Sequence, residues 1–266
     1  MSTVKFLKVF SIAVAGASLS FITSGSAQAT SFLSTNTGQI GTVDSATGTF
    51  NALATGVTFT DLALSSDNNL FGITFSQLFS IDTDNGSSSL IGNLGESMNA
   101  LGFTSSNALY GTGGSGFYQI DSATGVATSI ANISGFASSG DLVFDAVNDR
   151  FLATSSAGSS DSLFSIALDG TATELGSIGF SNVYGLSFEN DILLGYTADR
   201  QQITIDVATG AGTFDRTVTG VNGEIWGATS SLSSTAVPEP ASILGLLGFG
   251  ALGVGSSLKR KFQQKA

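Results

Sequence analysis

The chain has 266 residues, of which 42% are hydrophobic, 11% are charged and 34 are glycines, a composition typical of turns and short strands. It contains no histidine and no cysteine, which excludes Ser-His-Asp and Cys-His catalysis, disulfide bonds and a conventional zinc site. Residues 30–237 contain three arginines and 19 acidic residues, and their net charge of −16 repels phosphate backbones, so we expect no nucleic-acid partner.

Residues 1–29 have the pattern of a secretory signal peptide. Two lysines precede an apolar stretch at residues 9–22, and Ala27 and Ala29 form a small-x-small cleavage site. The apolar stretch is shorter than the roughly 18 residues that span a bilayer. We therefore expect cleavage after Ala29, with a retained membrane anchor as the alternative.

A repeat of about 40 residues follows, and we assign residues 30–232 to one domain built from it. The segments GTVDSATG, FSIDTDNG, YQIDSATG and ITIDVATG share an aspartate four residues before a glycine. In a fifth segment, LFSIALDG, Ala167 takes the place of the aspartate after the strand, and Asp169 and Gly170 make the turn. Aspartates in this setting accept hydrogen bonds from nearby backbone N–H groups, so we interpret them as structural turn residues. These turn aspartates are Asp44, Asp82, Asp121 and Asp206.

Each complete copy of the repeat reads as four strands. DLALSSDNNLFGIT, for example, is a strand, a polar turn and a strand; QLFSID is a third strand, and SSSLIGNL follows the turn as a fourth. Four antiparallel strands in about 40 residues, repeated, are typical of β-propeller blades. The predicted fold class is therefore all-β, a five-bladed β-propeller of four-stranded blades, with a six-bladed or open arrangement as the alternative.

The first copy lacks its opening strand, whereas residues 224–230, after the fifth copy, supply a spare one. We expect this strand to pair with the N-terminal strands and complete the first blade, which removes two open sheet edges. The segment IWGAT within it nevertheless resembles second strands such as LFGIT more closely than first strands.

Three kinds of site remain compatible with the composition of the repeats. Paired carboxylates could hydrolyse glycosides, although short, regular blades favour the turn role of the aspartates. Calcium could occupy the acidic turns at residues 65–69, 82–86 and 145–149, none of which has the EF-hand spacing. Exposed aromatic side chains could bind sugars, although their positions in strands favour the core. The aromatic candidates are Tyr110, Tyr118, Tyr184, Tyr196 and Trp226.

The end of the chain carries a different pattern. Both prolines of the sequence fall in a Val-Pro-Glu-Pro segment at the end of a linker, residues 233–240. Residues 241–258 are uncharged and of marginal length for a transmembrane helix, and the positive-inside rule places the basic tail, residues 259–266, in the cytoplasm. The motif residues are Val237, Pro238, Glu239 and Pro240, and the basic cluster is Lys259, Arg260 and Lys261.

This tail resembles the PEP-CTERM sorting signal of Gram-negative bacteria in its Pro-Glu-Pro core, its apolar span and its basic end. The resemblance implies recognition by an exosortase-type processing peptidase after transient anchoring in the inner membrane. It also implies removal of the tail, which leaves the remainder on the cell surface or in an extracellular polysaccharide matrix. An ordinary single-pass anchor is the alternative.

We therefore expect an exported, exosortase-sorted, non-enzymatic propeller with a structural or binding role and an association with exopolysaccharide. No catalytic residue, metal or cofactor is assigned, with structural calcium in the acidic turns as the alternative. A carboxylate-based glycosidase and a lectin-like adhesin are the two alternative functions.

Overall fold

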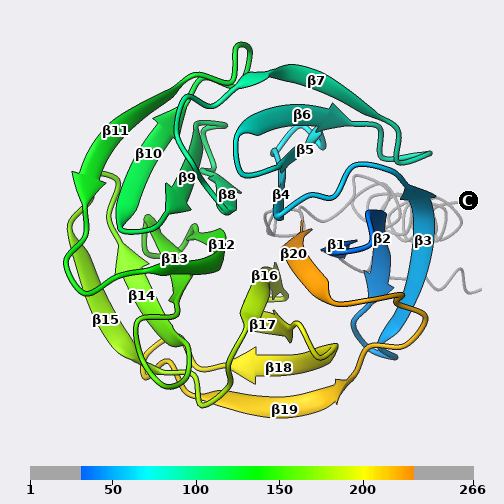
Figure 1. Ribbon diagram of the computed structural model, residues 1–266. Helices are drawn as coiled ribbons and strands as arrows, with labels where there is room; N and C mark the ends of the chain where they lie inside the picture. The colour runs from blue at the N-terminus through cyan, green and yellow to red at the C-terminus, as the bar shows by residue number, and fades with distance from the viewer. Residues whose placement is uncertain (1–30, 231–266) are drawn as a thin grey trace, which may run out of the picture.

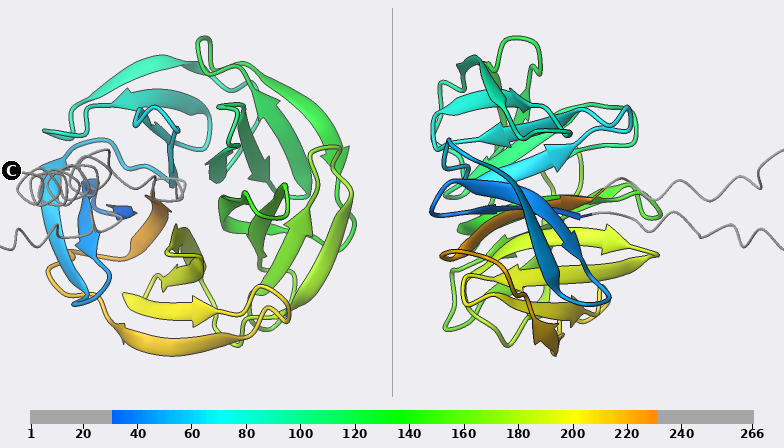
Figure 2. Two further views of the ribbon diagram at one scale, coloured as in Figure 1. Left: turned by 180° about the vertical axis from the view of Figure 1, so that it is seen from behind. Right: turned by 90° about the vertical axis from the view of Figure 1, so that its right-hand side faces the viewer.

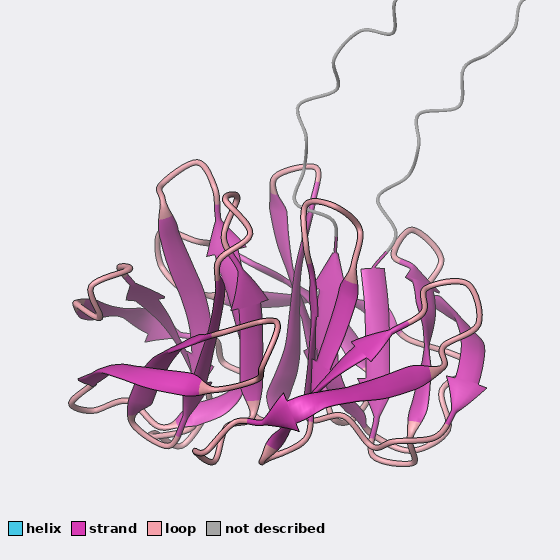
Figure 3. Cartoon of the chain, turned by 90° about the horizontal axis from the view of Figure 1, so that it is seen from above, coloured by secondary structure: helices cyan, strands magenta, loops and turns pink. Residues whose placement is uncertain are grey.

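The computed structural model describes residues 31–230. Four predicted segments lie outside the described residues: the signal peptide at 1–29, the linker at 233–240, the transmembrane helix at 241–258 and the basic tail at 259–266. Residues 31–230 form 20 strands and no helix (Figure 3). This part of the chain therefore contains no helix that could cross a membrane.

The strands form five sheets of four strands each around a central axis (Figure 1). Each sheet is a blade that runs from an inner strand beside the axis to an outer strand at the rim. The predicted all-β, five-bladed propeller is confirmed, and the six-bladed and open alternatives are wrong.

From inner to outer strand, blade I consists of β20 (Ile225–Ser230), β1 (Ser31–Thr35), β2 (Gln39–Asp44) and β3 (Thr49–Thr55). Blade II consists of β4 (Asp61–Leu64), β5 (Leu70–Ile73), β6 (Gln77–Ile81) and β7 (Ser88–Asn93). Blade III consists of β8 (Ala100–Phe103), β9 (Leu109–Gly113), β10 (Gly116–Ile120) and β11 (Ala127–Asn132). Blade IV consists of β12 (Ser138–Asp145), β13 (Arg150–Ser155), β14 (Ser162–Ile166) and β15 (Ala172–Ser177). Blade V consists of β16 (Val183–Glu189), β17 (Ile192–Thr197), β18 (Gln201–Ile205) and β19 (Gly212–Thr217).

The hairpin between the inner and second strands of a blade depends on asparagine or aspartate. In blades II, III and IV this turn contains Asn68, Asn107 and Asp149, whose φ angles are 60°, 61° and 51°. In blade V the same turn contains Asn190 and Asp191, which also have positive φ angles. These two residue types adopt the left-handed conformation more readily than most others. The local sequence is therefore sufficient to place these turns.

Blade I is completed by both ends of the described chain. β20 pairs antiparallel with β1, with Ser31 opposite Ser230 and Leu33 opposite Ala228. The predicted closure by residues 224–230 is confirmed, and β20 takes the inner position although its sequence resembles a second strand. Because β1 already pairs with β2, its open edge faces the axis, and β20 fills that edge between β16 and β4.

Both ends of the described chain lie on the same face of the ring (Figure 2, Figure 3). Ser31 and Ser230 are partners in the β1–β20 ladder. The N–H of Leu64, at the end of β4, donates to Thr229 Oγ1 near the end of β20 at 3.1 Å, so these neighbouring inner strands end on the same face. We call this the terminal face, defined by Ser31 and Ser230. The inner strands begin on the opposite face.

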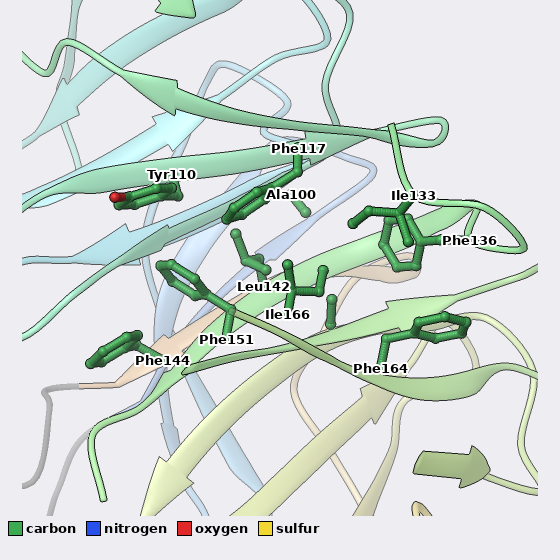
Figure 4. Close-up of a cluster of buried hydrophobic side chains, with 11 residues drawn as sticks. Ala100, Tyr110, Phe117, Ile133, Phe136, Leu142, Phe144, Phe151, Phe164 and Ile166 are labelled. Atoms are coloured by element: carbon green, nitrogen blue, oxygen red, sulfur yellow. The ribbon is translucent and has the colours of Figure 1, made fainter. Parts of the chain in front are cut away.

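The hydrophobic core consists of layers between neighbouring blades. Between blades III and IV eleven buried residues pack together, among them Phe151 of β13, which is 0% exposed (Figure 4). The centre of its ring lies 5.1 Å from that of Tyr110, 5.1 Å from that of Phe144 and 6.0 Å from that of Phe117. These ring contacts join the two blades and fix one against the other.

Candidate functional site

The four turn aspartates lie in separate blades, each at the hairpin between the third and fourth strands. In blade V, Oδ1 of Asp206 accepts hydrogen bonds from the backbone N–H groups of Ala208 (2.8 Å) and Thr209 (3.0 Å), and Gly210 follows with a φ of 76°. The bond from Ala208 lowers the pKa of Asp206. The ring keeps these carboxylates apart, so they do not form one site. The same pair of bonds, to the N–H groups two and three residues on, is made by Asp44, Asp82 and Asp121.

In the acidic turns considered for calcium, carboxylates bond to other side chains of the protein. Asp67, in the turn 65–69, accepts a hydrogen bond from Nδ2 of Asn107 at 2.8 Å. Asp145, at the start of the turn 145–149, forms an ion pair with Arg150, with 3.0 Å between Oδ2 and Nε. Within residues 31–230, no three acidic side chains come together as metal ligands.

The five aromatic candidates occupy different environments. Tyr110 and Tyr196 belong to the core, with 7% and 0% of their surfaces exposed. Tyr118 is half-buried on β10, whereas Tyr184 and Trp226 are half-buried at the second positions of β16 and β20. These two inner strands are neighbours at the axis. The tertiary structure therefore brings Tyr184 and Trp226 together beside the axis, on the face opposite the chain ends.

We call this place the hub mouth and define it by Asp161, Asn182, Tyr184, Glu224 and Trp226. The indole N–H of Trp226 donates to Glu224 Oε2 at 3.2 Å, and the Tyr184 hydroxyl donates to Asn182 Oδ1 at 3.0 Å. Burial raises the pKa of Tyr184, and the charges of Asp161 and Glu224 raise it further, so both acids lie near this ring. The hub mouth thus combines two aromatic rings with carboxylate and amide acceptors.

Two features hold the hub mouth in place. Asp161 is 3% exposed, and its Oδ2 accepts hydrogen bonds from Ser139 Oγ and from the Val183 N–H, both at 2.7 Å. These bonds connect a turn of blade IV to the starts of β12 and β16. Gly140 faces the tyrosine, because a Cβ added there would lie 3.2 Å from Cδ1 of Tyr184. The glycine therefore makes room for the aromatic ring.

Glycoside hydrolysis by two carboxylates needs a pair that the substrate can reach. Asp61 of β4 and Asp141 of β12 lie within hydrogen-bonding reach of each other at the axis. They are 0% and 1% exposed, so a polysaccharide cannot reach them. No motif singles out either aspartate, and the available signal is an aspartate followed directly by apolar residues of the inner strand in two of the five copies, DLAL and DLVF.

Two hollows of the described surface lie away from the hub mouth. One is lined by Asn69 and Asp82 in blade II, and the other by Phe75 and Glu96. Both are shallow and open to solvent.

Residues 236–261 match the PEP-CTERM protein-sorting motif. The chain therefore carries an exosortase sorting signal and is an exported protein, transiently anchored in the membrane and sorted to the cell surface. Several sequence-predicted site residues lie outside the described residues: Ala27 and Ala29 of the cleavage site, Val237, Pro238, Glu239 and Pro240 of the motif, and Lys259, Arg260 and Lys261 of the basic cluster.

No curated protein sequence matches the chain. A protein of unknown function from Bacteroides thetaiotaomicron is similar in structure (TM-score 0.51, 14% identity), and the match covers 76% of this chain and 62% of that one. TolB from Acinetobacter baumannii is also similar (TM-score 0.49, 13% identity), and the match covers 77% of this chain and 66% of TolB. A gluconolactonase from Xanthomonas campestris is similar as well (TM-score 0.47, 14% identity), with 64% of this chain and 65% of that chain covered. The chain thus spans less than two thirds of each structure. The first likeness shows a shared fold alone.

Proposed function

We propose that this protein is a non-enzymatic propeller of the Gram-negative cell surface that binds extracellular polysaccharide through the hub mouth. The observation that carries the proposal is that the hub mouth lies on the face opposite Ser31 and Ser230. The sorting motif follows Ser230 in the chain, so while the chain is anchored through its C-terminal tail the terminal face is turned toward the membrane. The hub mouth then points outward, toward the matrix.

The chemistry of the hub mouth suits sugars. Tyr184 and Trp226 offer apolar ring faces against which the C–H groups of a sugar ring can pack. Glu224 and Asn182 supply oxygens that accept hydrogen bonds from sugar hydroxyls. The net charge of −16 over residues 30–237 favours neutral or amine-bearing polysaccharides over uronic acids. The carboxylate pair at the axis is sealed from solvent, which supports binding without hydrolysis.

Trp226→Ala and Tyr184→Ala are each expected to weaken binding to the exopolysaccharide of the producing cells by about tenfold or more, because aromatic anchors dominate the energy of small interfaces. Affinity electrophoresis of the exported protein measures this loss. Phe214→Ala is the matched control, since it removes a ring that is 50% exposed on the outer strand β19, far from the hub mouth, and should bind like the wild type.

Equal binding by the two hub-mouth variants and the wild type would contradict the proposal. Hydrolysis of the polysaccharide that disappears in a single carboxylate variant would favour the glycosidase alternative. Binding of several sugars per molecule at equivalent positions of the blades would favour a lectin-like adhesin, because Tyr184 and Trp226 occur at one place in the ring.

Replacing Pro238, Glu239 and Pro240 with alanine is expected to keep the protein in the membrane fraction. The prolines bias the backbone before the apolar span toward an extended form, which a peptidase groove can bind as an added strand. Cell fractionation with immunoblotting measures the retention. Alanine at Ser233, Ser234 and Thr235 is the control and should be processed normally; unchanged release of the motif variant would show that another signal sorts the chain.

A further inference from the structure

The hub contains two buried aspartates that the proposed function does not use. Asp61 and Asp141 occupy equivalent positions in the inner strands of blades II and IV, where the other three inner strands have Ala100, Gly185 and Gly227. A larger residue does not fit at the two glycines. A Cβ on Gly227 would lie 2.6 Å from Cα of Asp61, and a Cβ on Gly185 would lie 2.8 Å from the Cβ of Ala228.

The two carboxyl groups connect the inner strands of all five blades, because they belong to blades II and IV and accept hydrogen bonds from backbone N–H groups of blades II, III, V and I. Asp61 accepts two of these hydrogen bonds, each at 2.7 Å, one on each oxygen. Oδ2 of Asp141 accepts two more, at 2.6 Å and 3.3 Å, and the N–H of Leu142 also lowers the pKa of Asp141. The two side chains thus hold the whole ring together at its centre. The donors, from blade II round to blade I, are Leu62, Leu101, Leu186 and Ala228.

The second oxygen of Asp141 is in an unusual position. Among the described residues no donor reaches its Oδ1, which is buried, and the carboxyl groups of Asp61 and Asp141 lie within hydrogen-bonding reach of each other. Two carboxyl groups can share a hydrogen bond only if one of them is protonated. In residues 31–230 the arginines are elsewhere: Arg150 and Arg216 pair with Asp145 and Asp215, and the remaining one is exposed in a turn. No cationic side chain of this part of the chain therefore compensates the pair.

We propose that Asp61 and Asp141 share one proton in the folded protein and act as a pH-sensitive lock on the five inner strands. Burial raises the pKa of Asp61 well above the ordinary value, and the neighbouring Asp141 charge raises it further. Burial also raises the pKa of Asp141, although the N–H groups of Leu186 and Ala228 oppose this rise. The shared proton then lies between the Asp61 carboxyl group and Oδ1 of Asp141, the oxygen that no other donor reaches.

This lock gives stability a defined dependence on pH. Above the ordinary aspartate pKa of 3.8, the unfolded chain has lost the proton that the folded pair still holds. Stability therefore falls as pH rises from that value to the raised pKa of the pair, and the unfolding equilibrium constant rises about tenfold per pH unit from this proton alone. Above the raised pKa both states have lost the proton, and the contribution stops changing.

Asp141→Asn is the variant that separates this lock from general repulsion among surface acids. Its amide nitrogen takes the place of the unpartnered Oδ1 and donates to Asp61, while its oxygen still accepts from Leu186 and Ala228. Asp61→Asn is the matched variant. Both oxygens of Asp61 accept N–H groups, so an amide there leaves one N–H without an acceptor and should be less stable than Asp141→Asn at every pH.

The experiment is urea unfolding of the full chain from pH 4 to pH 9, with infrared spectra of the folded protein at neutral pH. We expect the wild type to lose stability more steeply with pH than Asp141→Asn, by the one-proton slope, and to show a carboxylic-acid band that the variant lacks. Parallel pH profiles, or no acid band in the wild type, would overturn the proposal. A chelator that lowers the wild-type midpoint but not that of the variant would also overturn it, since a divalent cation would then hold the pair together.

Discussion

Ala228→Pro is expected to lower the free energy of unfolding by about 3 kcal/mol or more, because proline removes a backbone N–H from the middle of a paired strand. Ala228 is 1% exposed, lies opposite Leu33 in the β1–β20 ladder and donates its N–H to Asp141 at the hub. The substitution therefore disrupts the closure of blade I and removes one of the four N–H hydrogen bonds to the buried carboxyl groups at the hub. For a domain of this size the melting temperature should fall by about 6 to 12 °C.

Thermal unfolding followed by circular dichroism measures this effect. Ala228→Gly is the control, because it keeps the N–H and removes one methyl group, and the extra backbone freedom of glycine costs only about 0.5–1 kcal/mol. If the proline and glycine variants melted at the same temperature, β20 would not close the ring in solution, and blade I would be complete without it.

Phe151→Ala is the second substitution with a large expected effect, a loss of about 3–5 kcal/mol in the free energy of unfolding. Phe151 is 0% exposed, and its ring touches Tyr110 and Phe117 of blade III and Phe144 of its own blade. Removing it leaves a cavity between two blades that the rigid strands cannot fill. A loss of this size is a large share of the 5–15 kcal/mol that stabilises a typical domain.

Urea unfolding measures the loss as a lower midpoint with an unchanged slope, since the area exposed on unfolding barely changes. Phe214→Ala removes the same side chain from a half-exposed position on the outer strand and should change stability by no more than about 0.5 kcal/mol. Similar losses in the two variants would mean that the contacts between blades III and IV do not determine the stability of the ring.

The strands and turns could be predicted because their causes are local. The hairpins follow from Asn68, Asn107 and Asp149 at left-handed positions, and the outer turns follow from carboxylates such as that of Asp206. The position of β20 was harder to predict. Its residues resemble a second strand, and its inner place follows from the open edge of β1, which lies almost 200 residues away in the chain.

The candidate site was predicted only in part. Trp226 and Tyr184 are aromatic candidates in the sequence, but so are Tyr110 and Tyr196, which the structure places in the core. Tyr110 and Tyr196 lie on the second strands β9 and β17, whereas Tyr184 and Trp226 lie near the beginnings of inner strands. That assignment needs the ring, because the neighbours of an inner strand come from other repeats.

The sequence by itself determined the number of blades, the strands within them and the sorting signal at residues 236–261, because each depends on residues close together in the chain. Only the tertiary structure decided what meets at the axis: the paired carboxyl groups of Asp61 and Asp141 and the neighbouring strands that carry Tyr184 and Trp226. These partners lie about one or two repeats apart, and ring closure places them side by side. Every blade contributes one strand to the hub, so the chemistry there depends on all five together.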